Sequence, residues 1–515
     1  MGPAATASAF GPGGDSGLER ATRFEAVIGL EVHVELDTRT KMFCGCAIAF
    51  GGEPNTRTCA VCLGQPGSLP VVNRTAVEYA IRLGLALGCD IAPSSQFHRK
   101  NYFYPDMPKN YQISQYDAPI CLGGHLEIPA ASGAGEAVED GPHHVGITRV
   151  HMEEDTGKSL HVGTSGRIHG ADYSLVDYNR AGIPLLEVVS EPDIRSAAQA
   201  RAYLTELRAI VLALGISDAK LEEGSMRCDA NISLRPVGHT VYGTRVEVKN
   251  MNSARSLGRA IDYEVARQTK LLTAGEPVVQ ETRHWNEDAG VTSTLRVKEE
   301  VFDYRYFPDP DLVPVEPDAA WIQRLAADLP ELPAARRARL HSQLGLSTDQ
   351  AVAVVASGMA GPMEDAVVVG ADAAEAANWL TNEVAGWCHE HDVDPAAAPL
   401  SGAHLAELVG MVGDGTLSVR LARQVLEAVL GGEGSPRQVA ADRGLEQISD
   451  TEALRAAVDA AIADNADAAQ RVRDGNDKAI GALVGAVMRA TRGQANPAVV
   501  NQLLRERLTT GDRRR

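Results

Sequence analysis

Apolar and polar residues alternate in several segments of the first half of the chain. In residues 28–36 every even-numbered position is apolar, and residues 228–234 and 245–249 repeat this period of two. Because successive side chains of a strand point to opposite faces, each segment is predicted to be a strand with one apolar face. Residues 185–189 form an apolar run that one glutamate interrupts, and the run at 145–150 leads into acidic residues. The first half is therefore predicted to be rich in strands.

A period of three to four residues marks the predicted helices. Ser196 can cap and Gly215 can end one helix in the first half. Its apolar residues share one face: Tyr203, Leu207, Ile210 and Leu214. From about Pro317 the composition shifts to Ala, Leu, Glu and Arg, and helical spacing recurs in residues 405–412 and 421–429. The second half is therefore predicted to be helical, with its last helical unit ending around Leu508.

These patterns predict an α+β protein in which a sheet domain precedes helical domains. The predicted divisions are a leader, a sheet domain, a helical domain and a helical tail: residues 1–22, 23–328, 329–440 and 441–515. The leader is rich in Ala, Gly and Pro and is predicted to be disordered, because it lacks the basic start and apolar stretch of a signal peptide. No run of about 18 apolar residues occurs, so we expect a cytoplasmic protein without a membrane span.

The polar faces of the predicted strands are unusually acidic. They carry three sets of residues: Glu31, His33 and Glu35; Asp229, Asn231 and Ser233; and Arg245, Glu247 and Lys249. Glu153, Glu154 and Glu187 add carboxylates in less regular settings. A carboxylate among branched apolar residues, such as Glu187, is costly to bury unless it is paired or binds a cation.

Two interpretations of these acidic faces remain open at the level of sequence. They are either the solvated faces of antiparallel strands or parts of one site. If they converge, two like charges 4 Å apart repel by about 4 kcal/mol at an effective dielectric constant of 20. Such a cluster needs a divalent cation or raised pKa values. Oxygen ligands with one imidazole suit Mg²⁺ or Mn²⁺ better than zinc.

The cysteines fall into two groups. Four of them form a C-x-C and a C-x-x-C pair: Cys44, Cys46, Cys59 and Cys62. This spacing predicts a structural zinc site in preference to four reduced thiols, since four thiolates leave no coordination position for a substrate. The others are isolated and predicted to be small buried residues: Cys89, Cys121, Cys228 and Cys388. Residues 155–159 end like a phosphate-binding Walker A loop, but Met152 stands where its first glycine is required, so a turn is predicted.

The net charge of −19 argues against a protein that binds nucleic acid over its whole surface, because phosphate contacts need Lys and Arg. Charges are screened over about 8 Å at physiological salt, so local basic patches can act independently of the total. Arg99 with Lys100, and the terminal Arg513, Arg514 and Arg515, are candidate patches. The alternative is that these short runs are ordinary solvated surface.

Eight motifs occur in a fixed order along the chain. They are IGLEVHVEL (28–36), RKNYFYPD (99–106), HMEED (151–155), LEVVSEPD (186–193), RCDAN (227–231), EVKN (247–250), DYRYFP (303–308) and GQANP (493–497). In this order they resemble the family of B and E subunits of tRNA-dependent amidotransferases, and the resemblance covers nearly all of residues 24–508. The last motif is similar to the signature of a YqeY-type tail.

The resemblance implies a fold and an activity. The fold would be a cradle domain on an antiparallel sheet, a helical domain and a YqeY-type helical tail. Such subunits are ligases that use ATP and Mg²⁺ to phosphorylate the side-chain carboxylate of Glu-tRNA(Gln) or Asp-tRNA(Asn). In these complexes the A subunit is an amidase that releases ammonia from glutamine, and the ammonia displaces the phosphate. A small C subunit completes the heterotrimer.

The resemblance also implies residue roles. The metal ligands and catalytic residues would be Glu31, His33, Glu154, Glu187, Asp229 and Glu247. Glu153 and Asn231 lie beside them. Lys100, Tyr102 and Tyr104 would face the nucleotide or the acceptor end of the tRNA, where tyrosines can stack on an unpaired base. Lys249 could neutralise phosphate charge.

The sequence departs from the family pattern in two places, and two other functions compete. The cysteine quartet is present in only some members, and residues 163–170 resemble an insertion. No room exists for the additional domain of archaeal E subunits, which favours the B type. The first competing function is a non-catalytic tRNA-binding scaffold, although a scaffold for a polyanion gains nothing from carboxylates. The second is a stand-alone metal-dependent hydrolase, for which no nucleophile motif stands out.

Overall fold

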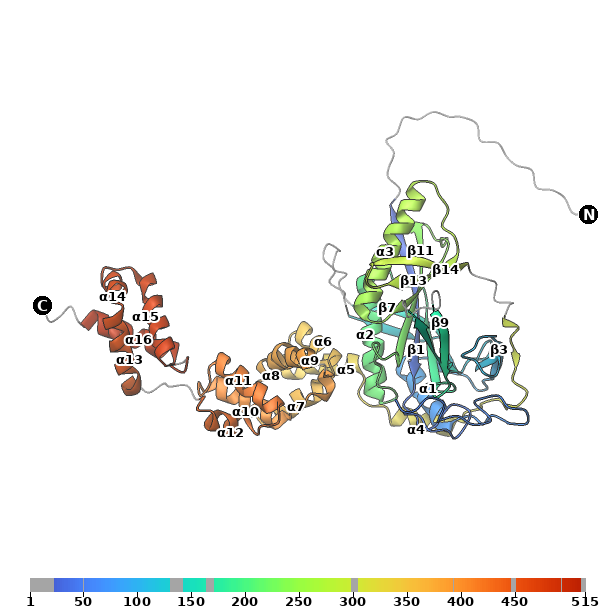
Figure 1. Ribbon diagram of the computed structural model, residues 1–515, viewed down its shortest axis with the longest axis horizontal. Coiled ribbons are helices and arrows are strands. Elements are labelled where there is room, and N and C mark those ends of the chain that lie inside the picture. The colour runs from blue at the N-terminus through green and yellow to red at the C-terminus, as the bar shows by residue number, and fades with distance from the viewer. Residues whose placement is uncertain are drawn as a thin grey trace, which may run out of the picture. The chain divides into compact units, whose positions relative to one another are not determined.

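The computed structural model describes residues 23–49, 51–129, 142–163, 171–297, 304–391, 393–445, 451–491 and 493–510. The chain divides into two compact units, Met1–Pro330 and Glu331–Arg515, which are taken in turn (Figure 1). Three predictions concern residues outside the described part: the disordered leader at 1–22, the terminal arginines 513–515 and most of the insertion at 163–170.

A ten-stranded sheet, counted over the described residues, forms the centre of the first unit. Its order is β14-β13-β12-β11-β1-β10-β7-β5-β2, and β6 also pairs with β7. The bounds are β1 (Phe24–Glu35), β2 (Asp90–Ile91), β5 (Cys121–Leu122), β6 (His125–Ile128), β7 (His143–Glu154), β10 (Pro184–Ser190), β11 (Met226–Pro236), β12 (Val246–Met251), β13 (Glu281–Asn286) and β14 (Val291–Val297).

The strands of this sheet pair antiparallel except for β12 and β13, which are parallel. Parallel neighbours need a long crossover connection, and helix α3 (Ala254–Thr273) supplies it. The predicted α+β class, with a sheet region before a helical region, is confirmed. The antiparallel sheet that the resemblance implies is present, and the one parallel pair makes it a mixed sheet.

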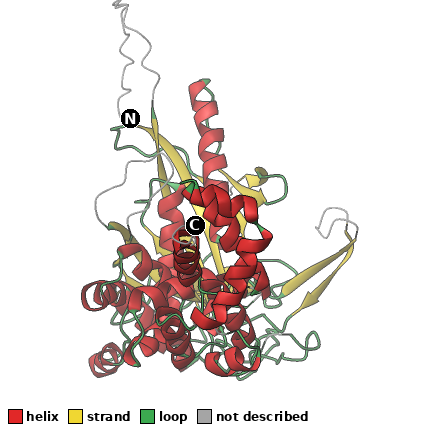
Figure 2. Ribbon diagram, turned by 90° about the vertical axis from the view of Figure 1, so that its left-hand side faces the viewer, coloured by secondary structure: helices red, strands yellow, loops and turns green. Residues whose placement is uncertain are grey.

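Two smaller sheets complete the first unit. β3 (His98–Asn101) lies between β4 (Tyr111–Ser114) and β15 (Phe307–Pro308). β8 (Lys158–Gly163) and β9 (Ala171–Asp177) form a two-stranded ribbon that extends away from the main sheet (Figure 2). Residues 155–157 of the Walker-like segment connect β7 to β8, residues 158–159 begin β8, and no helix follows within the described residues. Helices α1 (Arg74–Ala86) and α4 (Ala319–Ala327) contact each other.

The apolar face of the sheet is buried beneath helices. Ile28, Leu30, Val32 and Val34 of β1 are fully buried, as their alternation predicts. Helix α2 (Ala197–Leu214) and α3 pack together against this layer (Figure 1). The predicted ends of α2 are confirmed: the Ser196 hydroxyl accepts the amide of Gln199, and Gly215 adopts a left-handed φ of 63°.

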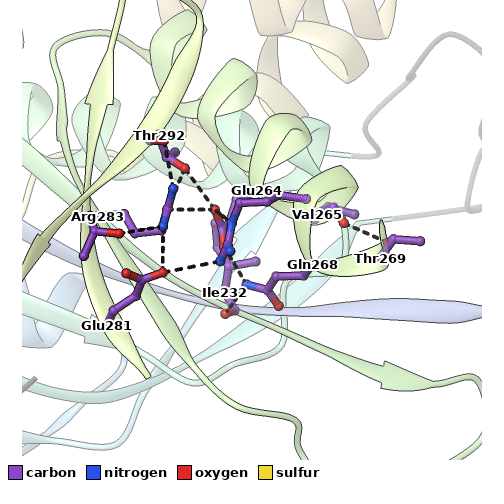
Figure 3. Close-up of polar contacts among 10 residues, drawn as sticks. Ile232, Glu264, Val265, Gln268, Thr269, Glu281, Arg283 and Thr292 are labelled. Carbon is purple, nitrogen blue, oxygen red and sulfur yellow. Dashed lines mark hydrogen bonds and ion pairs between the residues drawn. The ribbon is translucent and has the colours of Figure 1, made fainter. Parts of the chain in front are cut away.

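A buried ionic network joins α3 to β13 and β14 (Figure 3). The carboxylate of Glu264, which is fully buried, accepts hydrogen bonds from Arg267 and Gln268 and lies 3.6 Å from the Arg283 guanidinium. Arg283 also donates to Glu281 at 2.6 Å and to the carbonyl oxygen of Thr292 at 2.8 Å. Two arginines therefore balance two glutamates on the helix-covered side of β13.

The second unit is helical throughout its described residues. Its helices are α5 (Pro333–Leu344), α6 (Thr348–Ala356), α7 (Ala360–Val368), α8 (Ala373–Asn378), the π-helical η2 (Trp379–Val384), α9 (Ala385–His391), η3 (Pro395–Ala397), α10 (Gly402–Gly413), α11 (Val419–Leu430), α12 (Pro436–Asp442), α13 (Thr451–Asp464), α14 (Ala466–Arg473), η4 (Asp477–Ala479), α15 (Ile480–Ala490) and α16 (Pro497–Thr510).

The second unit has two separate hydrophobic cores. One draws on buried residues from Leu340 to Ala440, and the other on buried residues from Leu454 to Leu508. Among the described helices, none alone is long and apolar enough to span a membrane; only α6 and α7, bent by 117° between them, meet that test as a pair.

Replacing Glu264 with Ala tests the buried network. The change leaves the buried Arg283 and the half-buried Arg267 with Glu281 as the one remaining carboxylate of the network, and breaking a buried pair in this way costs about 3–5 kcal/mol. We expect urea unfolding of the first unit to show a loss of that size. Glu223→Ala, which breaks an exposed pair with Lys220, is the control and should change stability by less than about 1 kcal/mol. Equal losses for both variants would contradict a special role for the network.

Candidate functional site

Strand register brings the predicted acidic residues together on the face opposite the helices. β1 lies between β10 and β11, so Glu31 stands opposite Asp229 and His33 stands opposite Glu187. One strand further on, Asn231 stands opposite Glu247. Directly opposed residues of neighbouring strands share a face with their Cβ atoms about 4.5–5.5 Å apart. The polar faces of these strands therefore converge, which spacing alone left open.

Glu31, Asp229 and Glu247 form one cluster, called here the acid triad, in which one oxygen of each lies within 4.8 Å of the others. Lys249 provides its counter-charge: its ammonium pairs with Asp229 and lies 3.2 Å from Glu247 Oε1. Burial raises the pKa of Glu31, and the charges of Glu187 and Glu247 raise it further. The cluster thus holds more negative charge than one lysine balances.

The acid triad fits a hard divalent cation. Asn231 donates from Nδ2 to Glu31 Oε1 at 2.9 Å, whereas its Oδ1 is buried and has no hydrogen-bond partner among the described residues. Buried polar atoms in proteins nearly always have a partner, so this oxygen is suited to a ligand. Carboxylate and amide oxygens are the donors that Mg²⁺ and Ca²⁺ prefer.

A second cluster, called here the imidazole cluster, contains His33, Glu153 and Glu187 within the same 4.8 Å limit. His33 Nε2 lies 3.3 Å from Glu187 and 3.6 Å from Glu153. His151 Nε2 lies 3.2 Å from the same Glu187 oxygen. Burial opposes the imidazolium form, but Glu187 and Glu153 outweigh it and raise the pKa of His33 to about 9. Burial likewise opposes the Glu187 carboxylate, yet His151 and His33 hold its pKa well below the usual range.

Glu154 does not join either cluster, which changes the predicted ligand set. It is the last residue of β7 and points to the face opposite that of Glu153, because adjacent strand residues alternate. Its carboxylate pairs with Lys109 and accepts the amide of Ile113 at 2.9 Å. The structure therefore places Glu153, and not Glu154, beside His33 and Glu187.

Lys100, one of the residues predicted to face a nucleotide, lies near the imidazole cluster, where the charges of Glu153 and Glu187 act on it. Lys100 is close to Tyr304, with its ammonium 5.0 Å from the ring centroid. Burial opposes the charged form of Lys100, but the pKa of its ammonium is raised by three neighbours, Tyr306, Glu153 and Glu187. Its neighbour Arg99 pairs with Asp309 at 2.8 Å and with Asp311 at 2.9 Å, so Arg99 is a structural cation and not an open basic patch.

Two stacked aromatic pairs lie on the segments that carry Lys100 and its neighbour Tyr306. Tyr102 and Tyr104 stack with ring centroids 5.3 Å apart and planes inclined by 4°. Tyr116 and Tyr306 stack at 4.4 Å, and Tyr116 is half exposed. Exposed, stacked rings are suited to contact a flat ligand such as a nucleobase.

Sequence reasoning missed three contributors to the site. His151 belongs to the motif HMEED, and because it lies two residues before Glu153, the two side chains share a face if the motif is a strand. Tyr116 carried no such pattern. Thr282, whose hydroxyl donates to Glu247 Oε2 at 2.7 Å, is an ordinary strand residue and gave no chemical signal.

The cysteine quartet is assembled in the structure. Its four sulfur atoms all lie within 4.8 Å of one another, as a tetrahedral metal site requires; they belong to Cys44, Cys46, Cys59 and Cys62. A hydrogen bond with Cys44 and other contacts lower the pKa of Cys62 to about 5, which favours the thiolate. These sulfurs fit zinc. The remaining cysteines, Cys89, Cys121, Cys228 and Cys388, are buried, as predicted.

Comparison with known proteins yields the same assignment from both halves of the chain. Residues 26–323 match the model of the GatB/GatE catalytic domain, and residues 362–508 match that of the GatB domain. The chain belongs to the GatB/GatE family. It is 54% identical to the B subunit of the aspartyl/glutamyl-tRNA(Asn/Gln) amidotransferase of Thermobifida fusca, covering 99% of each chain.

Further relatives of this family carry the same name. The B subunit from Frankia casuarinae is 54% identical over 94% of this chain and 96% of its own length. That of Moorella thermoacetica is 52% identical over 94% of this chain and its whole length. The GatB/GatE catalytic region of this chain contains the acid triad, the imidazole cluster and the cysteine quartet.

The pairing of His33 predicts a pH dependence of stability in the metal-free protein. Its folded pKa of about 9 exceeds the ordinary value of 6.5, so the pairing stabilises fully below pH 6.5 and is lost as pH rises through 9. The shift corresponds to about 3 kcal/mol. Urea unfolding in a chelator between pH 6 and 10 should show a steeper decline for wild type than for His33→Gln. His144→Gln, an exposed histidine, should keep the wild-type slope; equal slopes for all three would refute the pairing.

Metal analysis of the purified full chain tests the cysteine quartet. We expect about one zinc ion per chain, since four thiolates complete one tetrahedral site. Cys59→Ser should lose this zinc and lower the thermal stability of the first unit, because a closed zinc site contributes folding energy. Cys388→Ser, outside the quartet, should retain it. Zinc that persists in Cys59→Ser would contradict the site.

Proposed function

We propose that this chain is the B subunit of a tRNA-dependent amidotransferase that converts Glu-tRNA(Gln) or Asp-tRNA(Asn) into Gln-tRNA(Gln) or Asn-tRNA(Asn). It would phosphorylate the side-chain carboxylate with ATP, and ammonia from the A subunit would displace the phosphate. The observation that carries this proposal is the convergence of the acid triad and the imidazole cluster on one face of the sheet, in a chain of the GatB/GatE family.

The chemistry explains why such a site would be acidic. A carboxylate is a poor acyl donor, and the acyl phosphate made from it has a good leaving group. Phosphoryl transfer depends mainly on positioning and on stabilising charge. Mg²⁺ bound by the acid triad and the imidazole cluster would neutralise charge on the phosphate oxygens. The proposed ligands are Glu31, Asp229, Glu247, Asn231, His33, Glu153 and Glu187.

The cations and rings of the site would hold the substrates. Lys249 lies between Asp229 and Glu247 and can shift its contacts to a phosphate once a metal ion takes up the carboxylates. Lys100 provides a second ammonium near Glu153 and Glu187. The Tyr102–Tyr104 and Tyr116–Tyr306 stacks offer surfaces for the base of the nucleotide or of the tRNA acceptor end.

The proposed reaction is that of a carbon–nitrogen ligase with glutamine as amido donor, acting in translation. The partners would be the amidase (A) subunit, the small C subunit and the misacylated tRNA. We place the reaction in the cytoplasm, where aminoacyl-tRNA is consumed. Glu154, which pairs with Lys109 and accepts the amide of Ile113, links β7 to β4 and is not among the proposed ligands.

An ammonia-dependent assay isolates the role of this protein within the complex. The full chain is co-expressed with its A and C partners and supplied with ATP, Mg²⁺, ammonium and Glu-tRNA(Gln), which bypasses the glutaminase. Release of phosphate and formation of Gln-tRNA(Gln) are measured, with Asp-tRNA(Asn) as the second substrate. Glu31→Gln removes a charge from the acid triad, and we expect its kcat to fall by at least about 100-fold with tRNA binding retained.

Glu223→Gln, an exposed change away from the site, is the matched control and should leave the rate unaltered. If Glu31→Gln forms amide at the wild-type rate, the activation site is misplaced and the alternative of a non-catalytic tRNA scaffold gains support. If wild type forms no amide from either tRNA while both bind, the proposed reaction is wrong.

A further inference from the structure

Thr282 lies directly behind one carboxylate of the acid triad. It is fully buried on β13, and the parallel register places it opposite Glu247 of β12. Its hydroxyl donates to Glu247 Oε2 at 2.7 Å, and Glu247 is itself 6% exposed. Because the donor is uncharged, this contact orients the carboxylate without cancelling its charge.

The hydroxyl holds Oε2 of Glu247 and so fixes the plane of its carboxylate. Oε1, the other oxygen, lies 3.2 Å from the Lys249 ammonium, which in turn pairs with Asp229. The terminal torsion of a glutamate is broad and roughly two-fold, so an unheld carboxylate samples several orientations. The bond to Thr282 holds the carboxylate in the orientation in which Oε1 faces Lys249.

The position of Thr282 depends in turn on the opposite side of its strand. Glu281 and Arg283 flank it and point to the helix-covered side, where they join the Glu264 network of α3 (Figure 3). β12 and β13 share only three register pairs. A slip of one residue would turn a charged side chain of β13 towards the acid triad and Thr282 away from it. The buried network therefore keeps the neutral hydroxyl on the acidic face.

We propose that Thr282 is a positioning residue for the acid triad: its hydroxyl presets Glu247 for a divalent cation, and the ionic network on α3 holds it in register. This inference rests on the proposed function, in which the acid triad binds such a cation. Outer residues that orient a metal ligand typically change metal affinity by about 10- to 100-fold when they are removed.

Direct binding of Mn²⁺ tests the inference without any turnover. Mn²⁺ is titrated into the metal-free full chain at fixed pH, and free Mn²⁺ is followed by electron paramagnetic resonance. Thr282→Val removes the hydroxyl at similar volume and should raise the Kd for Mn²⁺ by about 10- to 100-fold. Thr282→Ser keeps the hydroxyl and should restore a Kd close to that of wild type. A purely structural role would not produce rescue by serine at unchanged thermal stability.

Two further variants separate the possible outcomes. Ser233→Ala removes a buried hydroxyl on β11 that faces the carbonyl oxygen of Val27, and it should leave the Kd unchanged. Glu247→Gln removes a proposed ligand and should weaken binding at least as much as Thr282→Val. If Glu247→Gln binds Mn²⁺ like wild type, the cation site fails and the role of Thr282 fails with it. If only Glu247→Gln weakens binding, the cation site stands and the positioning role is overturned.

A second pair of variants tests the proposal if Thr282→Val fails to fold. If Thr282→Val does not yield folded protein, Thr282→Ala and Thr282→Ser provide a pair in which only serine retains the hydroxyl. A weaker Mn²⁺ affinity for Ala than for Ser, at matched thermal stability, supports the positioning role. Equal affinities overturn it.

Discussion

Repulsion among carboxylates is the constraint on which the acidic face of the sheet depends. Five of them, drawn from five strands, are gathered into two adjacent clusters: Glu31, Glu153, Glu187, Asp229 and Glu247. At 4 Å each like-charged pair costs about 4 kcal/mol in a medium of effective dielectric 20. Part of this cost is offset by contacts with Lys249, His33 and His151. The remaining repulsion is opposed by the burial of the sheet's apolar face beneath α2 and α3, which holds the strands together.

The two sides of the sheet use buried charge in different ways. Around Glu264, every charge has a partner of opposite sign and the network is neutral, which fixes α3 and β13 but leaves nothing to bind a ligand. Around the acid triad, negative charge is in excess and Asn231 retains an unpartnered oxygen among the described residues. A site that binds a cation needs this excess negative charge and a free oxygen, whereas a network that only stabilises the fold needs every charge to be paired.

The sequence predicted the features that depend on the local geometry of a single strand or helix. Alternation placed Glu31 and His33 on one face of β1, and the Ser196 cap and Gly215 stop gave both ends of α2. Which faces meet depends on register between segments that lie as much as 210 residues apart, and no local pattern encodes it. The motif HMEED shows the difference. The family resemblance favoured Glu154, whereas the strand that ends in this motif puts Glu153 on the face of His151.

Thr282 marks the limit of sequence reasoning in another way. A buried threonine in a strand is common, and its importance comes only from the residue opposite it, which a parallel crossover through α3 determines. The cysteine quartet is the contrary case. Its paired spacing constrains the geometry so strongly that the four sulfurs were expected to meet, and they do.

The central place of β1 has a consequence for synthesis on the ribosome. Among the described strands β1 is made first, yet its two neighbours, β10 and β11, begin only at Pro184 and Met226. At about 5–20 residues per second, roughly 7–30 s pass while residues 36–183 are added. During that time an apolar strand with two unpaired edges waits for its partners, and such a segment is prone to aggregate.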